Sequence, residues 1–182
     1  EVQQAVVKSG GIAALVALMR KGTTGGQVTV GCVWDLARAL DSLTRDNAAN
    51  RAAIVDAAAV GPLVALLTNG STGEQEQAVR ALANFALCDT IREAIVDAGA
   101  IPPLVALVTS GAAGGPRGAV CVLENLATDN SRNQAAIVAA GAVGPLIALA
   151  RDAESSRSLK DAAESALYAL GLLSRASEVV WQ

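Results

Sequence analysis

The stretch AIVDAGAIPPLVALV, residues 94–108, decides the fold of this chain, because close copies of it recur along the sequence. The copies are AIVDAAAVGPLVALL at 53–67, AIVAAGAVGPLIALA at 136–150 and the more divergent VVKSGGIAALVALM at 6–19. The first leucine of each copy marks intervals of 48, 41 and 42 residues: Leu15, Leu63, Leu104 and Leu146. A period of about 40 residues with helical patterning predicts an all-helical solenoid of four stacked units.

The composition fits such a stack and argues against several other classes of protein. Hydrophobic residues make up 52% of the 182 residues and aromatic residues only 2%, so the core is expected to consist mainly of Ala, Val, Leu and Ile. The net charge of -3 gives no basic footprint for nucleic acid or anionic lipid. The chain has no His, and Cys32, Cys88 and Cys121 lack paired spacing, so we expect reduced thiols, no metal site and no cofactor.

The longest uncharged run, residues 133–150, reaches the length at which a membrane span is considered. Its sister copies carry Asp56 and Asp97, and Gly141 and Pro145 interrupt it, so we interpret it as a helical hairpin of a soluble protein. With unpaired thiols and no recognisable signal peptide, the expected location is the cytoplasm, with the nucleus as a second compartment. Because the sequence does not begin with Met, we also expect a fragment of a longer protein.

Each unit is expected to contain a short helix, a sharp bend, a second helix, a glycine-rich turn and a longer third helix. Gly99 and Gly141 stand where the short helix would end in the left-handed conformation; Gly10 and Ala58 hold the same place. The first turn of the second helix contains an aligned proline, whose missing N–H is not needed there: Pro62, Pro103 and Pro145. The first and second helices should therefore meet at an angle.

The second helices should end at aligned glycines, Gly22, Gly70 and Gly111, with Ala153 in the fourth unit. We interpret the whole run 111–118 as a turn between helices, because GTTGGQ and GSTGEQ occupy the same place in other units. The third helices are predicted at 78–86, 119–127 and 163–170, and at 37–44 with an earlier start in the longer first unit. Their buried face is marked by aligned apolar residues: Leu40, Leu43, Leu82, Phe85, Leu123, Leu126, Leu167 and Leu170.

Across the copies the chain reads Asn-Arg-x-Ala-Ile-Val-x-Ala-Gly-Ala-Ile-Pro-Pro-Leu-Val-x-Leu and then Ala-x-x-Ala-Leu-x-Asn-Leu-Ala, which resembles the armadillo repeat. The resemblance is strong over 50–150 and weaker at both ends, and it looks closest to the arrays of plant-type U-box ubiquitin ligases and the vacuolar armadillo scaffold. It implies an all-α, right-handed superhelix of about four three-helix repeats, whose third helices line a concave groove that typically holds an extended peptide. The expected repeats are 1–46, 47–88, 89–129 and 130–182, the last with a C-terminal cap.

The resemblance also implies which side chains face the groove. A groove Asn on each third helix grips the peptide backbone in this family, and the sequence keeps it at Asn84 and Asn125, with Ser42 and Ala169 in the outer repeats. In importin-α a Trp stands four residues earlier to hold lysine side chains, whereas this chain departs from that pattern, which argues against classical import cargo. With one further residue on the same face, the implied groove set is Arg38, Ser42, Gln77, Arg80, Asn84, Cys121 and Asn125.

The groove residues allow several interpretations. Arg38 and Arg80 favour a partner with acidic or phosphorylated side chains, but they are also typical of solvated helix surface or of pairing with an acid such as Asp41. The two groove asparagines, in turn, are also typical of buried links between neighbouring repeats.

The predicted function is a non-catalytic scaffold or interaction module that binds an extended segment of another protein. No His and no nucleophile beside a base are present, so we expect no catalytic residue. One alternative is the targeting module of a larger ubiquitin-ligase-type protein. Another is a structural homo-oligomer, dimeric or stacked end to end, for which Leu172, Leu173 and Trp181 would supply an apolar end.

Overall fold

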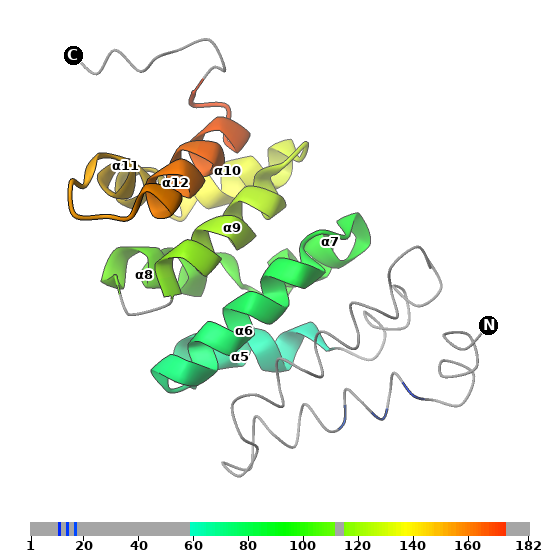
Figure 1. The fold of residues 1–182 in the computed structure, drawn as a ribbon. Helices are drawn as coiled ribbons and strands as arrows, with labels where there is room; N and C mark the ends of the chain where they lie inside the picture. The colour runs from blue at the N-terminus through cyan, green and yellow to red at the C-terminus, as the bar shows by residue number, and fades with distance from the viewer. Residues whose placement is uncertain (1–10, 12–13, 15–16, 18–58, 112–114, 174–182) are drawn as a thin grey trace. The chain divides into compact units, whose positions relative to one another are not determined.

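The computed structural model describes residues 11, 14, 17, 59–111 and 115–173, and every regular element in them is an α-helix (Figure 1). The chain divides into two compact units, Glu1–Ala100 and Ile101–Gln182. The first contains α5 (Val60–Asn69), α6 (Thr72–Phe85) and α7 (Asp89–Asp97). The second contains α8 (Ile101–Ser110), α9 (Gly115–Ala127), α10 (Ser131–Ala139), α11 (Val143–Arg151) and α12 (Arg157–Ala169). The predicted all-α class is confirmed.

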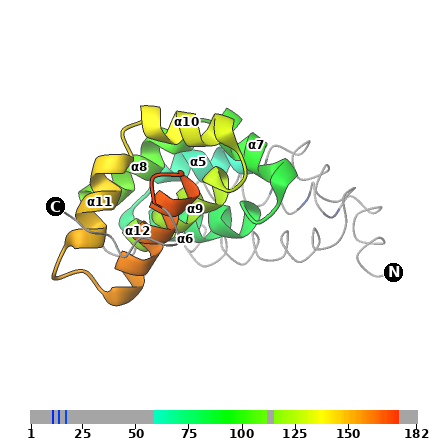
Figure 2. The same cartoon turned by 90° about the horizontal axis from the view of Figure 1, so that it is seen from above.

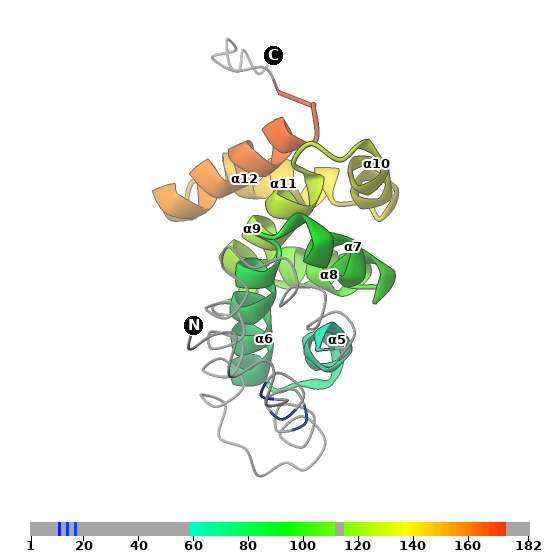
Figure 3. The same ribbon diagram turned by 90° about the vertical axis from the view of Figure 1, so that its right-hand side faces the viewer.

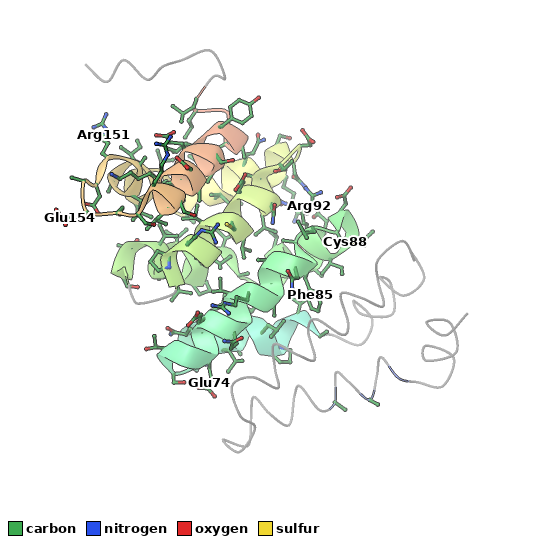
Figure 4. All side chains as sticks on the ribbon, in the orientation of Figure 1. Glu74, Phe85, Cys88, Arg92, Arg151 and Glu154 are labelled. Carbon is green, nitrogen blue, oxygen red and sulfur yellow. The ribbon has the colours of Figure 1, made fainter. Side chains whose placement is uncertain are left out.

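In the first unit, α5 packs against α6, and α7 contacts both helices. Figure 3 shows α5 nearly end-on beside the length of α6. Phe85, labelled near the end of α6 in Figure 4, is 1% exposed and is the one aromatic side chain in the core of the described part. The rest of this core is aliphatic, as the composition predicts.

In the second unit, α8 packs on α9, α9 lies beside α12, and α11 packs on both α12 and α8 (Figure 1). The aligned apolar residues that the sequence assigns to the core are all buried wherever the structure describes them. They are Leu63, Leu104 and Leu146 on the second helices, Leu82, Phe85, Leu123, Leu126 and Leu167 on the third helices, and Leu170 directly after α12. The predicted buried face is therefore confirmed there, while Leu15, Leu40 and Leu43 lie outside the described residues.

The bend between the short and second helices is seen at α10 and α11, which meet at 82° (Figure 2). Gly141 has φ 81° in this bend and Gly99 has φ 77° after α7, so both occupy the predicted left-handed region. Pro145 is the third residue of α11, where a helix does not need its N–H. Gly10 and Ala58 lie outside the described residues. Within the described ranges no single helix is long and apolar enough to cross a membrane; α10 and α11 reach that length only as a bent pair.

The third helices begin earlier than the sequence predicts, at Thr72, Gly115 and Arg157. The interpretation of the whole run 111–118 as a turn is therefore wrong, because 115–118 form the first turn of α9. Glycine and proline are tolerated there, since the N–H groups of a first helical turn have no partner within the helix. The start of α6 is built differently: it is preceded by the N-cap residue Ser71, whose backbone N and hydroxyl donate to Glu74 Oε2 at 2.8 and 2.7 Å.

The second helices end at the predicted glycines by two different routes. Gly111 adopts a left-handed φ of 62°, whereas Gly70 is extended and is needed for space, because a Cβ there would lie 2.6 Å from the carbonyl oxygen of Leu66. In the fourth repeat α11 ends at Arg151, which is labelled in Figure 4. The next residue, Asp152, accepts hydrogen bonds from the Ser155 hydroxyl and the Glu154 backbone N–H. These bonds lower the pKa of Asp152. A polar turn thus replaces the glycine, and Gly22 lies outside the described residues.

Two polar side chains of α10 form hydrogen bonds to neighbouring helices. Asn133 is fully buried, and its Nδ2 donates to the carbonyl of Leu126 at 3.0 Å. The next residue, Gln134, donates from Nε2 to the carbonyls of Ala127 and Ala169, each at 3.0 Å. The C-terminal ends of α9 and α12 are therefore held by side chains of the short helix between them.

Candidate functional site

The predicted groove residues of the second repeat lie on one side of α6. Gln77, Arg80 and Asn84 follow one another at helical spacing, and they are half-buried, exposed and half-buried. The core of α6 faces elsewhere, through Leu82 and Phe85. The helix thus presents a polar strip of three side chains.

Arg80 is ion-paired within its own helix. Its Nη2 lies 2.5 Å from Glu76 Oε1, and the two side chains are 54% and 29% exposed. The intramolecular interpretation therefore describes Arg80 here, with Glu76 as the partner; Asp41 lies outside the described residues. An exposed pair one helical turn apart contributes only about 0.3–0.5 kcal/mol to stability.

The predicted groove residues of the third repeat, Cys121 and Asn125, are both half-buried on α9. Neither belongs to the core. Among the described residues the fully buried asparagine is Asn133, which links α10 to the end of α9. Cys88 and Cys121 are free thiols, as expected, and Cys32 lies outside the described residues.

Burial raises the pKa of the Cys121 thiol, an effect opposed by Arg117 and assisted by Glu124. Cys121 is therefore expected to alkylate slowly near neutral pH, because the thiolate is the reactive form. In a variant with Cys32→Ser and Cys88→Ser, the pH profile of the iodoacetamide rate should have its midpoint above that of the same protein unfolded in urea. A midpoint equal to or below that of the unfolded control would contradict the assignment.

The fourth repeat contributes α12, where Ser165 and Ala169 align with Cys121 and Asn125. The hydroxyl of Ser165 donates to Glu124 Oε1, and Arg117 Nε donates to the hydroxyl of Ser158 at 2.8 Å. Polar contacts therefore run along the line where α9 and α12 meet.

Beside the C-terminal ends of α9 and α12 lies a pocket of about 500 Å³. It is lined by Glu124, Thr128, Asp129, Gln134, Ser165, Tyr168, Ala169, Gly171 and Leu173. None of its polar side chains was among the predicted site residues. Two signals in the sequence could have pointed to it: Tyr168 is the only tyrosine, and Glu124 directly precedes the groove residue Asn125.

Two predicted site residues, Arg38 and Ser42, lie outside the described residues. The α6 set belongs to the first unit and the α9 set to the second, so the structure groups Gln77 with Arg80 and Asn84, and Cys121 with Asn125. In the part of the chain that is described, no group of three or more His, Cys, Asp or Glu side chains is placed to hold a metal ion.

Comparison with known proteins agrees with the repeated helices of the structure. The Armadillo/beta-catenin-like repeat model matches residues 47–87 and 89–128. A search of curated proteins finds no match. Among solved structures, the chain is similar to an engineered protein at 34% identity and a TM-score of 0.75, with 92% of this chain and 65% of that chain covered.

A second engineered protein is also 34% identical, with a TM-score of 0.76 and coverage of 93% of this chain and 39% of that chain. A designed armadillo repeat protein in complex with the peptide (KR)4 is 26% identical, with a TM-score of 0.75 and coverage of 92% and 67%. The chain thus spans 65% and 39% of the lengths of the two engineered proteins.

Repeated helices, left-handed glycines at the bends and a leucine core shared by every described repeat agree with these matches. Together, the structural features and the matches describe an all-α solenoid of several repeats. This fold generally serves as a non-catalytic scaffold for binding other proteins. The chain belongs to the armadillo repeat family.

Proposed function

We propose that this chain binds an extended peptide segment of another protein along its third helices, and that it acts without catalysis. The observation that carries the proposal is the pair Asn84 and Asn125, which stand at the same position of consecutive repeats and are half-buried on α6 and α9. A designed armadillo repeat protein of similar structure was solved with a bound peptide, which supports the same use here.

An asparagine side chain suits this task because its amide has both a donor and an acceptor. One such amide can pair with the N–H and the C=O of a single residue in an extended peptide. Because these backbone groups are common to all sequences, the asparagines would provide affinity without selecting side chains. Selection would come from neighbouring positions such as Gln77, Arg80 and Cys121.

For the first two repeats we propose a partner with acidic or phosphorylated side chains near Arg38 and Arg80. The exposure of Arg80 supports this, because an incoming anion would need to displace only the weak pair with Glu76. We also propose that the protein works in the cytoplasm or nucleus, where thiols such as Cys88 and Cys121 stay reduced. The targeting module of a larger ligase-type protein would use the same groove.

A second candidate is self-association through the C-terminal repeat. Leu172 is 49% exposed just after α12 and Leu173 is half-buried, so an apolar surface is available there. Further copies of the chain would then cover these residues.

The test is a pull-down from a cell lysate with the wild-type chain and the double variant Asn84→Ala, Asn125→Ala, and identification of the retained proteins by mass spectrometry. A partner bound in the groove should be lost from the variant, while the melting temperature falls only slightly. The matched control is Asn69→Ala, which changes an exposed asparagine on α5 and should retain the partner.

Three other outcomes of this pull-down are informative. A large loss of stability with binding intact would show that the two asparagines are structural. Recovery of untagged copies of the chain itself, unchanged in the variant, would favour self-association. A partner that survives phosphatase treatment of the lysate and the Arg80→Gln change would contradict the acidic or phosphorylated ligand.

A further inference from the structure

The turn between α5 and α6 contains the only asparagine of the chain that is followed by a glycine, at Asn69 and Gly70. Asn69 is exposed as the last residue of α5, and Gly70 is the residue directly after that helix. At the aligned glycines of the first and third repeats, the preceding residues are Lys21 and Ser110. The pair Asn-Gly is therefore particular to the second repeat.

Packing requires the glycine of this pair but not the asparagine. A Cβ at position 70 would lie 2.6 Å from the carbonyl oxygen of Leu66 and 3.0 Å from the Cβ of Glu74, which is labelled at the start of α6 in Figure 4. Asn69, in contrast, is not among the buried residues of α5. The fold thus fixes Gly70 and leaves the amide of Asn69 in contact with solvent.

An exposed asparagine before glycine is open to reaction with its own backbone. The backbone nitrogen of Gly70 attacks Cγ of Asn69, its proton passes to the departing amide nitrogen, and ammonia leaves as a succinimide ring closes. Water then adds to either carbonyl carbon of the ring and gives aspartate or isoaspartate. In isoaspartate the main chain runs through the side-chain carbons and is one methylene longer. Glycine favours the first step because it has no Cβ to obstruct the approach.

The last hydrogen bond of α5 controls how often this reaction can begin. The N–H of Gly70 donates to the carbonyl oxygen of Leu66 at 3.0 Å, so the attacking nitrogen is engaged while the helix end is closed. Helix ends open by local fraying, without unfolding of the whole chain. A hydrogen bond of ordinary net strength should therefore slow the reaction about 2–12-fold relative to the unfolded chain, without abolishing it.

The other described asparagines are less suited to this reaction. Asn133 is fully buried, and Asn130 Oδ1 accepts a hydrogen bond from the backbone N of Asn133 at 3.0 Å. Asn84 and Asn125 are followed by bulky apolar residues, whose side chains obstruct the attacking nitrogen. Within the described ranges the reaction should therefore be concentrated at Asn69.

From these observations we propose that Asn69 is a site of spontaneous deamidation, and that its conversion to isoaspartate loosens the start of α6. The contacts of Gly70 leave little room for a longer main chain. Close by, Gln75 Nε2 donates to the carbonyl of Leu67 at 3.2 Å, which ties α6 to the last turn of α5. The new carboxylate would also stand at the C-terminus of α5, where the helix dipole disfavours negative charge. The reaction needs no bound peptide, so it is independent of the proposed function.

The test incubates the whole folded chain at physiological temperature and pH, beside the same chain in urea, and follows tryptic peptides by mass spectrometry. Peptide 52–80 contains Asn69 as its only asparagine. Its aspartate and isoaspartate forms have equal mass and are separated by chromatography against synthetic standards. Both should accumulate in the folded chain, about 2–12-fold more slowly than in urea. Peptide 118–132 of the folded sample, which contains Asn125 and Asn130, should stay unchanged over the same period.

Two variants separate the modification from its consequences. Asn69→Gln is the matched control, because it keeps an amide but would have to close a larger ring, so it should stay unmodified. Asn69→Asp adds the charge without the longer main chain. Aged wild-type chain should melt at least about 2 °C below fresh chain, whereas Asn69→Gln should melt at the same temperature before and after ageing. Fresh Asn69→Asp should melt between the fresh and the aged wild-type chain.

Three results would overturn the proposal. The first is an Asn69 that stays intact in the folded chain after the sample in urea has converted completely. The second is conversion of Asn69 with no fall in the melting temperature, which would show that the start of α6 tolerates isoaspartate. The third is an equal fall in aged Asn69→Gln, which would assign the loss of stability to another site.

Discussion

Leu104→Ala is expected to lower the free energy of unfolding by about 2–5 kcal/mol. Leu104 is fully buried in α8, which packs against α9 and α11. Removing most of its side chain leaves a cavity where helices of neighbouring repeats meet. In a repeat array these interfaces supply most of the stability, because a single repeat cannot bury its own apolar face.

The measurement is chemical denaturation followed by circular dichroism. The matched control is Leu172→Ala, the same chemical change in the same unit at a side chain that is 49% exposed. That control should change the free energy by no more than about 0.5 kcal/mol. Equal effects of the two substitutions would mean that α8 does not bury Leu104 in solution.

The position of Leu104 illustrates what the sequence could predict. Its copies Leu63 and Leu146 stand at the same place in other repeats, so three observations support one assignment, and all three residues are buried. The same holds for the bend, where Gly99 and Gly141 share a left-handed backbone. Residues that every repeat needs for packing recur in each copy, so they can be predicted from the sequence.

The starts of the third helices are predicted less well because each repeat begins its third helix with different residues. The second repeat uses the reciprocal pair Ser71 and Glu74, and the third repeat begins α9 with glycine and proline at 115 and 116. Comparing the copies emphasises what they share, so a helix start built from unrelated residues resembles a turn in such an alignment. Propensity alone could not correct this, since a first turn tolerates both kinds of sequence.

The candidate site was predicted only in part for a related reason. The repeat alignment names Arg80 and Asn125, but it does not show that Glu76 pairs with Arg80 or that Glu124, next to Asn125, contacts Ser165. Their contacts also depend on side-chain conformation: Glu76 reaches Arg80 along one helix, and Glu124 reaches Ser165 on another. The pocket arises from such individual contacts and therefore has no repeated signature.

A difference of one residue in the interval between repeats explains why α10 contains a buried asparagine. The third helices of the second and third repeats align at 41 residues, whereas the following short helices align at 42, which places one additional residue in the turn after α9. After α6 the carbonyl of Phe85 accepts a hydrogen bond from the backbone N–H of Cys88 at 3.0 Å. After α9 the chain passes through Asp129 at φ 52°, and the matching carbonyl of Leu126 is reached by Asn133 Nδ2 instead.

Asn133→Ala should therefore lower the free energy of unfolding by about 1–3 kcal/mol, because the carbonyl of Leu126 loses its side-chain donor in a buried site. The informative companion is Asn133→Ile, since the aligned residue after α6 is Ile91, which is 1% exposed. Isoleucine fills the space but donates nothing. If the hydrogen bond matters, both variants are destabilised; if Asn133→Ile is as stable as wild type in the same denaturation experiment, Asn133 contributes by packing alone. In that case the hydrogen bond from Asn133 to the carbonyl of Leu126 would result from the longer turn without stabilising it.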